Sequence, residues 1–171
     1  MDLAHERYEE LEKHIRQTCP SADTERIRAA FEYADQHHGP QLRKSGEPYI
    51  IHPIAVAEII VELELDQDSI IAALLHDCIE DTDSTHEDIA RLFSPAVADL
   101  VEGVTKLTRM QYTSREDEQM ENLRKMFMAM AKDVRVILIK LCDRLHNMRT
   151  LQYQSTAKQK EKALETMEVY A

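Results

Sequence analysis

Hydrophobic residues recur along almost the whole chain at the spacing of three and four positions that is typical of amphipathic α-helices. The sequence contains no run that alternates apolar and polar residues, and no Asn-Gly or Asp-Gly pair that would mark a β-hairpin. About nine helices are predicted: residues 3–17, 23–38, 53–65, 68–81, a short helix from 84, 94–103, 115–132, 133–151 and one from 156 to the end. This pattern predicts an all-α protein.

Start and stop signals support several of these boundaries. Gly39 suits the left-handed conformation that follows a helix, and Pro53 suits a first turn, where its missing N–H costs nothing. Asp68 and Asp133 are predicted to cap the helices that follow them. Residues 104–114 are expected to form a loop.

Length and composition favour one compact domain. The chain has 171 residues, with 43% hydrophobic and 31% charged residues, which excludes low-complexity and disordered classes. The longest apolar run, residues 70–75, is far shorter than the roughly 20 residues of a membrane span. With no signal-peptide pattern and three cysteines outside any CxxC motif, we predict a cytoplasmic protein with reduced thiols.

Charge restricts the partners. The net charge is −11 at pH 7, which opposes non-specific binding to nucleic acid. An anionic substrate would therefore require a metal ion or a local basic cluster.

Four titratable residues lie together on the polar side of the helix predicted over residues 68–81: His76, Asp77, Glu80 and Asp81. Three carboxylates so close together repel one another unless a cation or protons compensate them. A bound metal would satisfy this requirement. The alternative is a solvated helix end with a spare histidine.

The helix predicted over residues 133–151 is apolar on two sides, which indicates a central position in the fold. Asp143 falls on one of those sides, with Asn147 and Thr150 in the following turns. A buried carboxylate must be paired or coordinated. Its partner could be a metal, or Lys140 or Arg144 in a plain ion pair, and Asn147 and Thr150 could equally be ordinary surface groups.

Two imidazoles and two carboxylates from three predicted elements form a candidate metal site. His52 precedes Pro53 at a helix start, where a lone histidine more often caps or packs. Together with His76, Asp77 and Asp143 it makes a mixed nitrogen and oxygen set, which suits Mn, Fe, Zn or Co better than Ca.

A basic loop precedes His52. Arg43 can pair with phosphate or stack on a base, Lys44 adds a charge, and Gly46 permits close backbone approach. Arg43 and Lys44 are the nearest plausible cations to the candidate metal site. The alternative is a plain surface loop.

Four segments in this order resemble the hydrolase domain at the N-terminus of long Rel/SpoT-type synthetase/hydrolases of guanosine tetraphosphate (ppGpp), in the HD phosphohydrolase superfamily. They are RKSGEPYIIHP (residues 43–53), LLHDCIEDT (74–82), EGVTKLT (102–108) and LIKLCDRLHNMRTL (138–151). The resemblance implies a compact multi-helix HD fold that removes pyrophosphate from the 3′ position of (p)ppGpp, leaving GDP or GTP.

The resemblance also implies residue roles. One Mn²⁺ ion would be bound by His52, His76, Asp77 and Asp143, although another divalent transition metal is possible. Glu80 and Asp81 would be the catalytic carboxylates. The remaining implied contacts are to the nucleoside: Arg43 and Lys44 beside the guanine, and Ser45, Asn147 and Thr150 near the base and sugar. The alternatives are another HD-type nucleotide phosphohydrolase and a catalytically silent regulatory module.

The last segment, ALETMEVYA, resembles the continuation of this family toward its synthetase half. Residues 1–171 are accordingly expected to be a hydrolase domain of a longer protein that lacks its C-terminal continuation, and the alternative is a free-standing small hydrolase. Ala163, Leu164, Met167 and Tyr170 form an apolar stripe on the last predicted helix. This stripe either packs on the core of its own domain or contacts a synthetase domain in a longer protein.

Overall fold

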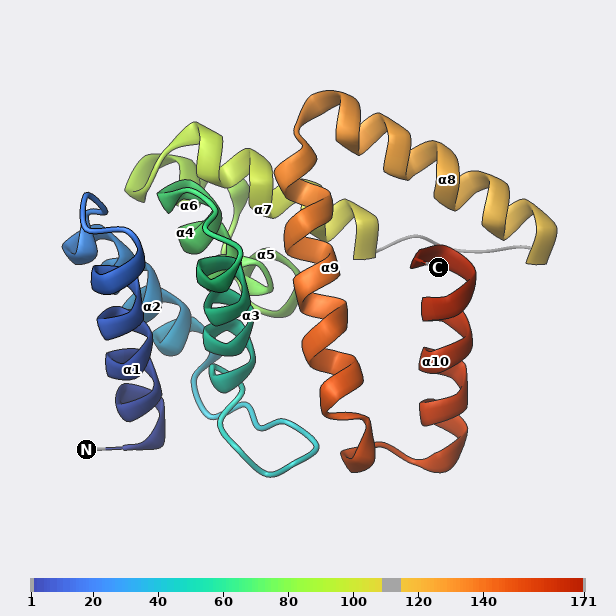
Figure 1. The fold of residues 1–171 in the computed structure, drawn as a ribbon, viewed down its shortest axis with the longest axis horizontal. Helices are drawn as coiled ribbons and strands as arrows, with labels where there is room; N and C mark the ends of the chain where they lie inside the picture. Colours follow the sequence, from blue (N-terminus) through green and yellow to red (C-terminus); the bar gives the residue numbers. More distant parts are fainter. Residues whose placement is uncertain (1, 109–114, 171) are drawn as a thin grey trace.

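The computed structural model describes residues 2–108 and 115–170, and all regular elements in these ranges are helices (Figure 1). The elements are α1 (Leu3–Thr18), α2 (Thr24–His38), α3 (Ile51–Glu62), α4 (Gln67–Leu75), α5 (Cys78–Asp81), α6 (His86–Leu92), α7 (Pro95–Thr108), α8 (Arg115–Lys132), α9 (Val134–Arg149), a 3₁₀ turn (Leu151–Tyr153) and α10 (Thr156–Tyr170). The prediction of an all-α protein is confirmed.

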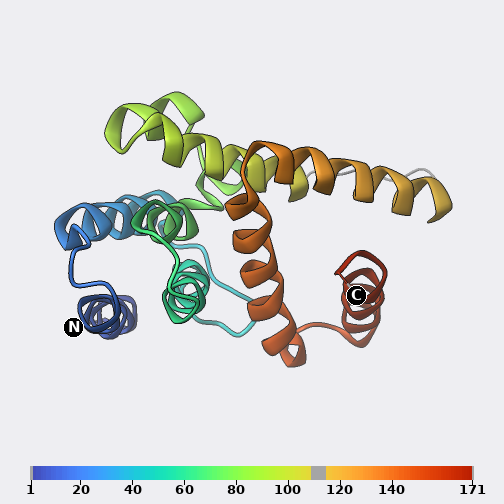
Figure 2. The same ribbon diagram turned by 45° about the horizontal axis from the view of Figure 1, so that its top comes forward.

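Two apolar helices, α3 and α4, form the centre of the core. They pack against each other; α1 and α9 lie against α3, while α2 and α7 lie against α4. Every residue of α4 from Ser69 to Leu75 is buried. In Figures 1 and 2, α9 stands between this helical group and α10, so that one face of α9 completes the core.

Several predicted end signals are confirmed. Asp133 caps α9 by accepting a hydrogen bond from the backbone N–H of Arg135. Gly39 ends α2 with a φ of 54°, a conformation that favours glycine. The predicted cap Asp68 is wrong, because Asp66 caps α4 by accepting the N–H of Ser69.

The third helix ends earlier than predicted, at Glu62 rather than residue 65. The N–H of Leu65 bonds to the carbonyl of Ile60, and the N–H of Glu64 bonds to the carbonyl of Val61. Glu64 has a φ of 56°. These are the features of a Schellman motif, here formed without glycine, which conceals it in the sequence.

The single helix predicted over residues 68–81 is interrupted at His76 and Asp77. The ring Nδ1 of His76 lies 2.6 Å from the carbonyl oxygen of Ala73. In a continuous α-helix this carbonyl would accept the N–H of Asp77. The helix therefore stops at Leu75 and resumes at Cys78, and the turn between them carries His76 and Asp77.

The predicted loop over residues 104–114 is wrong for residues 104–108, which continue α7, while residues 109–114 lie outside the described residues. Gly103 does not end this helix. A Cβ atom at Gly103 would meet Cγ2 of Val136 at 2.8 Å, so the glycine permits close packing of α7 on α9. No helix in the described residues is long and apolar enough to cross a membrane.

Candidate metal centre and adjoining cavity

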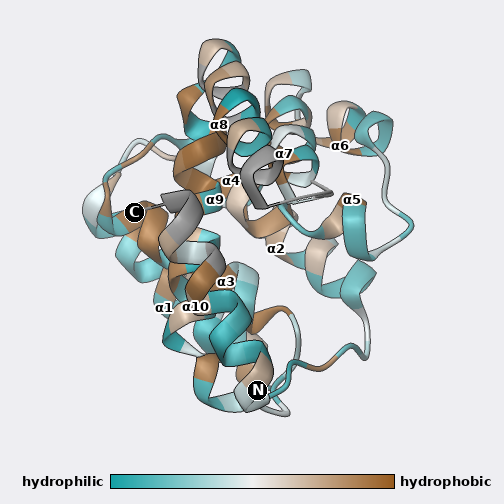
Figure 3. Ribbon diagram, turned by 90° about the vertical axis from the view of Figure 1, so that its right-hand side faces the viewer, coloured by the Kyte–Doolittle hydropathy of each residue, from teal (hydrophilic) through white to brown (hydrophobic). Residues whose placement is uncertain are grey.

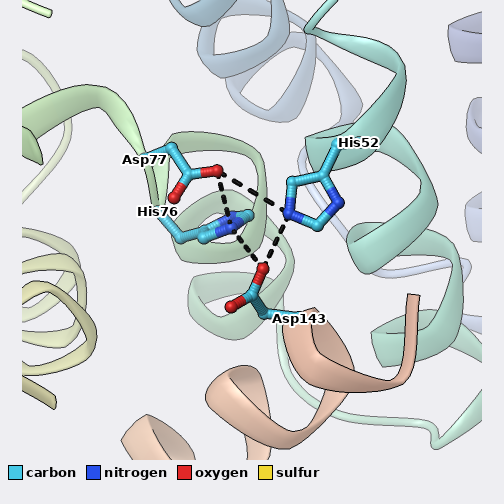
Figure 4. Close-up of side chains that lie close together, drawn as sticks. All are labelled: His52, His76, Asp77 and Asp143. Atoms are coloured by element: carbon cyan, nitrogen blue, oxygen red, sulfur yellow. Dashed lines mark hydrogen bonds and ion pairs between the residues drawn. The ribbon is translucent and has the colours of Figure 1, made fainter. Parts of the chain in front are cut away.

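The four predicted metal ligands lie together at the centre of the fold. His52 comes from the first turn of α3, His76 and Asp77 come from the turn between α4 and α5, and Asp143 comes from the middle of α9. All four point toward one another (Figure 4), and each offers a ligand atom within 4.8 Å of the others.

The imidazole nitrogens face the carboxylates. Nε2 of His52 is 2.7 Å from Oδ1 of Asp143 and 3.7 Å from Oδ2 of Asp77. Nε2 of His76 is 3.0 Å from Oδ2 of Asp77 and 3.3 Å from Oδ1 of Asp143. Two nitrogens and two oxygens thus surround one point. These four donor atoms are of the kinds that a borderline divalent metal prefers.

One buried atom shows that these residues fit a metal ion. Nε2 of His76 is buried and makes no hydrogen bond, while Nδ1 of the same ring is held by the carbonyl of Ala73. A neutral imidazole that donates its Nδ1–H has a free lone pair on Nε2. Such an arrangement, with the second nitrogen bonded to a carbonyl, is usual for a metal-binding histidine.

The electrostatic field of the cluster favours a cation. Burial alone would lower the pKa of His76, yet the carboxylates of Asp77 and Asp143 raise this pKa well above its ordinary value. Burial alone would raise the pKa of Asp77 and Asp143, but the neighbouring histidines outweigh it and lower the pKa of both aspartates. The same attraction that holds a proton here would hold a divalent ion.

Asp143 has a cationic partner as well as the histidines. Nζ of Lys140 donates to Oδ2 of Asp143 at 2.9 Å and to Oγ1 of Thr108 at 3.0 Å. The ion pair considered as an alternative is therefore present, but it uses only one carboxylate oxygen. The other oxygen, Oδ1, faces His52 and His76.

One cavity adjoins the cluster, and a second cavity lies beside the first. One of about 280 Å³ is lined by His52, Asp77, Glu80, Asp81 and Asp143 among others. The other, of about 490 Å³, is lined among others by Arg43, Lys44, Ser45, Asn147 and Thr150. Both are bordered by the same three residues, Tyr49, Asn147 and Lys162, so the cavities are neighbours.

All five predicted nucleoside-contacting residues therefore line one cavity, and both predicted catalytic carboxylates line the other. Arg43 donates from NH2 to Oδ1 of Asn147 at 3.2 Å and to Oγ1 of Thr150 at 3.3 Å, which joins the basic loop to the end of α9. The expectation that Arg43 and Lys44 are the nearest cations to the metal site is wrong. Lys140 is nearer, because it lies one helical turn from Asp143 on α9.

Sequence reasoning missed two side chains that complete the site. The hydroxyl of Tyr49 lies 2.6 Å from Oδ2 of Asp77 and 3.2 Å from Oδ2 of Asp81. Burial is the main reason that the pKa of Tyr49 is raised, so the hydroxyl keeps its proton as a donor. Nδ1 of His146 lies 2.7 Å from Nδ1 of His52, and burial, His52 and Arg43 lower the pKa of His146 to about 4. Only the position of Tyr49 in the basic loop could have signalled its role.

The chain is similar to a known domain family and to several curated proteins. Residues 30–171 match the family model described as HD domain. The chain is 49% identical over 164 residues to the bifunctional (p)ppGpp synthase/hydrolase SpoT of Escherichia coli K12, covering 96% of this chain and 23% of the relative. It is 52% identical over 163 residues to a guanosine-3′,5′-bis(diphosphate) 3′-pyrophosphohydrolase of Aquifex aeolicus, covering 95% of this chain and 23% of the relative.

A solved structure is also similar. It is described as a metazoan ortholog of SpoT that hydrolyses ppGpp and plays a role in starvation responses. The TM-score is 0.67 at 31% identity, with 84% of this chain and 83% of that chain covered. The chain thus spans about a quarter of the length of the curated relatives it matches, and most of the length of this structural neighbour.

Proposed function

The chain belongs to the HD-domain family, in the group that contains the SpoT proteins, and from this we propose that it hydrolyses the 3′-pyrophosphate of (p)ppGpp with a bound Mn²⁺ ion. The products are pyrophosphate and GDP, or GTP from the pentaphosphate. His52, His76, Asp77 and Asp143 hold the metal. The proposal extends to this chain what its relatives are named for.

The observation that carries the proposal is the position of the two cavities. The His/Asp cluster borders a 280 Å³ cavity, and the basic loop lines the neighbouring 490 Å³ cavity. A guanine nucleotide with phosphates on both sides of its ribose needs a nucleoside site beside a cation site. The basic loop supplies local positive charge in a chain whose net charge is −11.

In the proposed reaction, a water oxygen bonds to the phosphorus attached to the 3′ oxygen, and the bond between that phosphorus and the 3′ oxygen breaks. When bound, the metal supplies Lewis-acid chemistry that offsets charge on the phosphate oxygens and favours loss of a proton from water. Glu80 and Asp81 position the water and carry its proton, and the 3′ oxygen leaves with a proton. Arg43, Lys44, Ser45, Asn147 and Thr150 hold the nucleoside.

Incubation of the purified chain with ppGpp, with and without added Mn²⁺, tests this function. We expect GDP and pyrophosphate, released in equal amounts and only with the metal. Release of triphosphate or a simple monophosphate from another nucleotide would instead indicate a different HD phosphohydrolase. A chain that binds no metal and releases no product would be a silent regulatory module.

Replacing Arg43 by alanine should raise the KM for ppGpp about tenfold, since a hydrogen bond to a charged group contributes about 1.5 to 3 kcal/mol. A tenfold increase in KM corresponds to the lower limit of this energy range. We expect the lower limit because Arg43 already bonds to Asn147 and Thr150 without substrate. Steady-state kinetics at saturating Mn²⁺ measure it. Arg91→Ala, which removes an exposed arginine on α6, is the control. Unchanged KM in Arg43→Ala would return the loop to a plain surface role.

The described apolar residues at the C-terminal end support a second proposal, contact with a further domain in a longer protein. Leu164 and Met167 on α10 are 50% and 69% exposed, and Phe127 on α8 is 66% exposed. Figure 3 shows hydrophobic segments on both helices. The Tyr170 side chain lies outside the described residues. The relatives are about four times longer than this chain, which leaves room for a synthetase domain as the partner.

A longer chain that carries the next few tens of residues should therefore melt at a higher temperature and self-associate less than residues 1–171. Calorimetry and sedimentation measure the two effects. As a control, Leu164→Lys in residues 1–171 should leave the melting temperature nearly unchanged, because its side chain is half exposed. Equal melting and sedimentation of both chains would contradict the contact.

A further inference from the structure

His146 lies against the side of His52 that faces away from the carboxylates. The two Nδ1 atoms are 2.7 Å apart, the ring centroids are 4.9 Å apart and the planes differ by 28°, so the rings lie edge to edge. The opposite nitrogen of His52, Nε2, lies 2.7 Å from Oδ1 of Asp143. Helix α9 therefore contacts both nitrogens of one ring, through residues about one turn apart.

The contact between the two rings bears on the protonation of His52. Two nitrogens at hydrogen-bond distance share one proton, so one ring donates and the other accepts. A metal ligand needs the lone pair of Nε2, and a neutral imidazole carries a single proton, which must then reside on Nδ1. In that state Nδ1 of His146 is the acceptor. With the roles reversed, the proton of His52 would lie on Nε2 and block ligation.

His76 shows the same arrangement with a backbone acceptor. Its Nδ1 is bonded to the carbonyl of Ala73, and its Nε2 faces the carboxylates. For both histidines the inner nitrogen faces the cluster and the outer nitrogen has a polar partner. The difference is that the partner of His52 is a side chain, which mutation can remove.

We propose that His146 is a positioning residue whose Nδ1 accepts the Nδ1–H of His52 and so fixes the tautomer that leaves Nε2 free to bind a divalent metal. The inference rests on the metal centre of the proposed function. The His146 ring acts on His52, and His146 lines neither the 280 Å³ nor the 490 Å³ cavity.

The affinity for Mn²⁺ tests the role, measured from the electron paramagnetic resonance signal of the free ion in titrations of the metal-free protein. His146→Phe keeps an aromatic ring beside His52 but removes the acceptor. We expect its affinity to fall roughly 10- to 100-fold, the usual cost of losing such a partner of a metal ligand. His146→Asn places a carbonyl oxygen near the position of Nδ1, and its affinity should stay close to that of the wild type.

His37→Phe is the matched control. His37 is likewise half-buried, its ring stacks on that of Tyr33, and its Nδ1 bonds to the backbone carbonyl of Tyr33, but it belongs to no ligand set. Its Mn²⁺ affinity should equal that of the wild type. Circular dichroism of each variant verifies that it folds, and excess Mn²⁺ should restore ppGpp hydrolysis in His146→Phe.

The outcomes separate the two proposals. Wild-type affinity in His146→Phe, or equal loss in the Asn and Phe variants, would overturn the role of His146 alone. A wild-type chain without affinity for Mn²⁺ would overturn the metal centre and, with it, both proposals.

Discussion

Replacing Asp143 by alanine should abolish Mn²⁺ binding and reduce ppGpp hydrolysis to background. Asp143 supplies the oxygen that lies 2.7 Å from Nε2 of His52 and 3.3 Å from Nε2 of His76. Without it, the cluster keeps two imidazoles and one carboxylate, and it loses half of the negative charge that attracts the ion. No other aspartate or glutamate of the described residues joins this cluster.

Thermal unfolding with and without Mn²⁺ measures this loss independently of activity. A ligand that binds only the folded state at about 100 times its Kd adds about 2.7 kcal/mol to the free energy of unfolding. We expect this gain in the wild type and none in Asp143→Ala. For each protein, unfolding with Mn²⁺ is compared with unfolding without Mn²⁺. This comparison is needed because removing the carboxylate that pairs with Lys140 lowers stability even without metal.

Asp81→Asn is the control for the Asp143 substitution. Asp81 lines the same 280 Å³ cavity but is outside the four-residue cluster, so its variant should keep the stabilisation by Mn²⁺. Equal metal content in the wild type and Asp143→Ala would refute the proposed ligand set.

The candidate site was predictable from the sequence because chemistry and helical phase pointed to the same residues. A carboxylate on the doubly apolar helix α9 requires a partner, and the His-Asp pair that follows the buried helix α4 offers one. The structure places Asp143, His76 and Asp77 together at the crossing of these elements. The fold class was predictable for a similar reason, since helical periodicity runs through almost the whole chain.

The predictions that failed depend on local side-chain bonds or on close packing between helices. At His76 a side chain takes the carbonyl of Ala73, and Gly103 lies inside α7 because it permits the close approach of Val136. Neither effect has a periodic signal in the sequence. Spacing alone likewise could not identify Tyr49 or His146 as partners of the cluster, because their contacts join residues far apart in the chain.

The two proposed catalytic carboxylates lie beside the cluster and outside the proposed ligand set. Glu80 and Asp81 both line the 280 Å³ cavity, one helical turn after His76 and Asp77. Burial and the neighbouring Asp77 raise the pKa of Asp81, so it releases its proton at a higher pH than an ordinary aspartate. The hydroxyl of Tyr49 lies 3.2 Å from Oδ2 of Asp81 and 2.6 Å from Oδ2 of Asp77, so it lies between a proposed catalytic carboxylate and a proposed ligand.

Replacing Glu80 by glutamine or Asp81 by asparagine should lower kcat by roughly 10² to 10⁴, the usual contribution of general acid-base catalysis, without loss of Mn²⁺ or nucleotide binding. Asp83→Asn, just after α5 and outside the cavity lining, is the matched control and should keep full turnover.

The pH profile of kcat distinguishes the two carboxylates. If ionised Asp81 takes the proton of the water, kcat falls as the pH drops through the raised pKa of Asp81, and this decrease at low pH is lost in Asp81→Asn. If Glu80 is the base, the decrease of kcat at low pH persists in Asp81→Asn and disappears in Glu80→Gln. Wild-type turnover in both variants would contradict a catalytic role for either carboxylate.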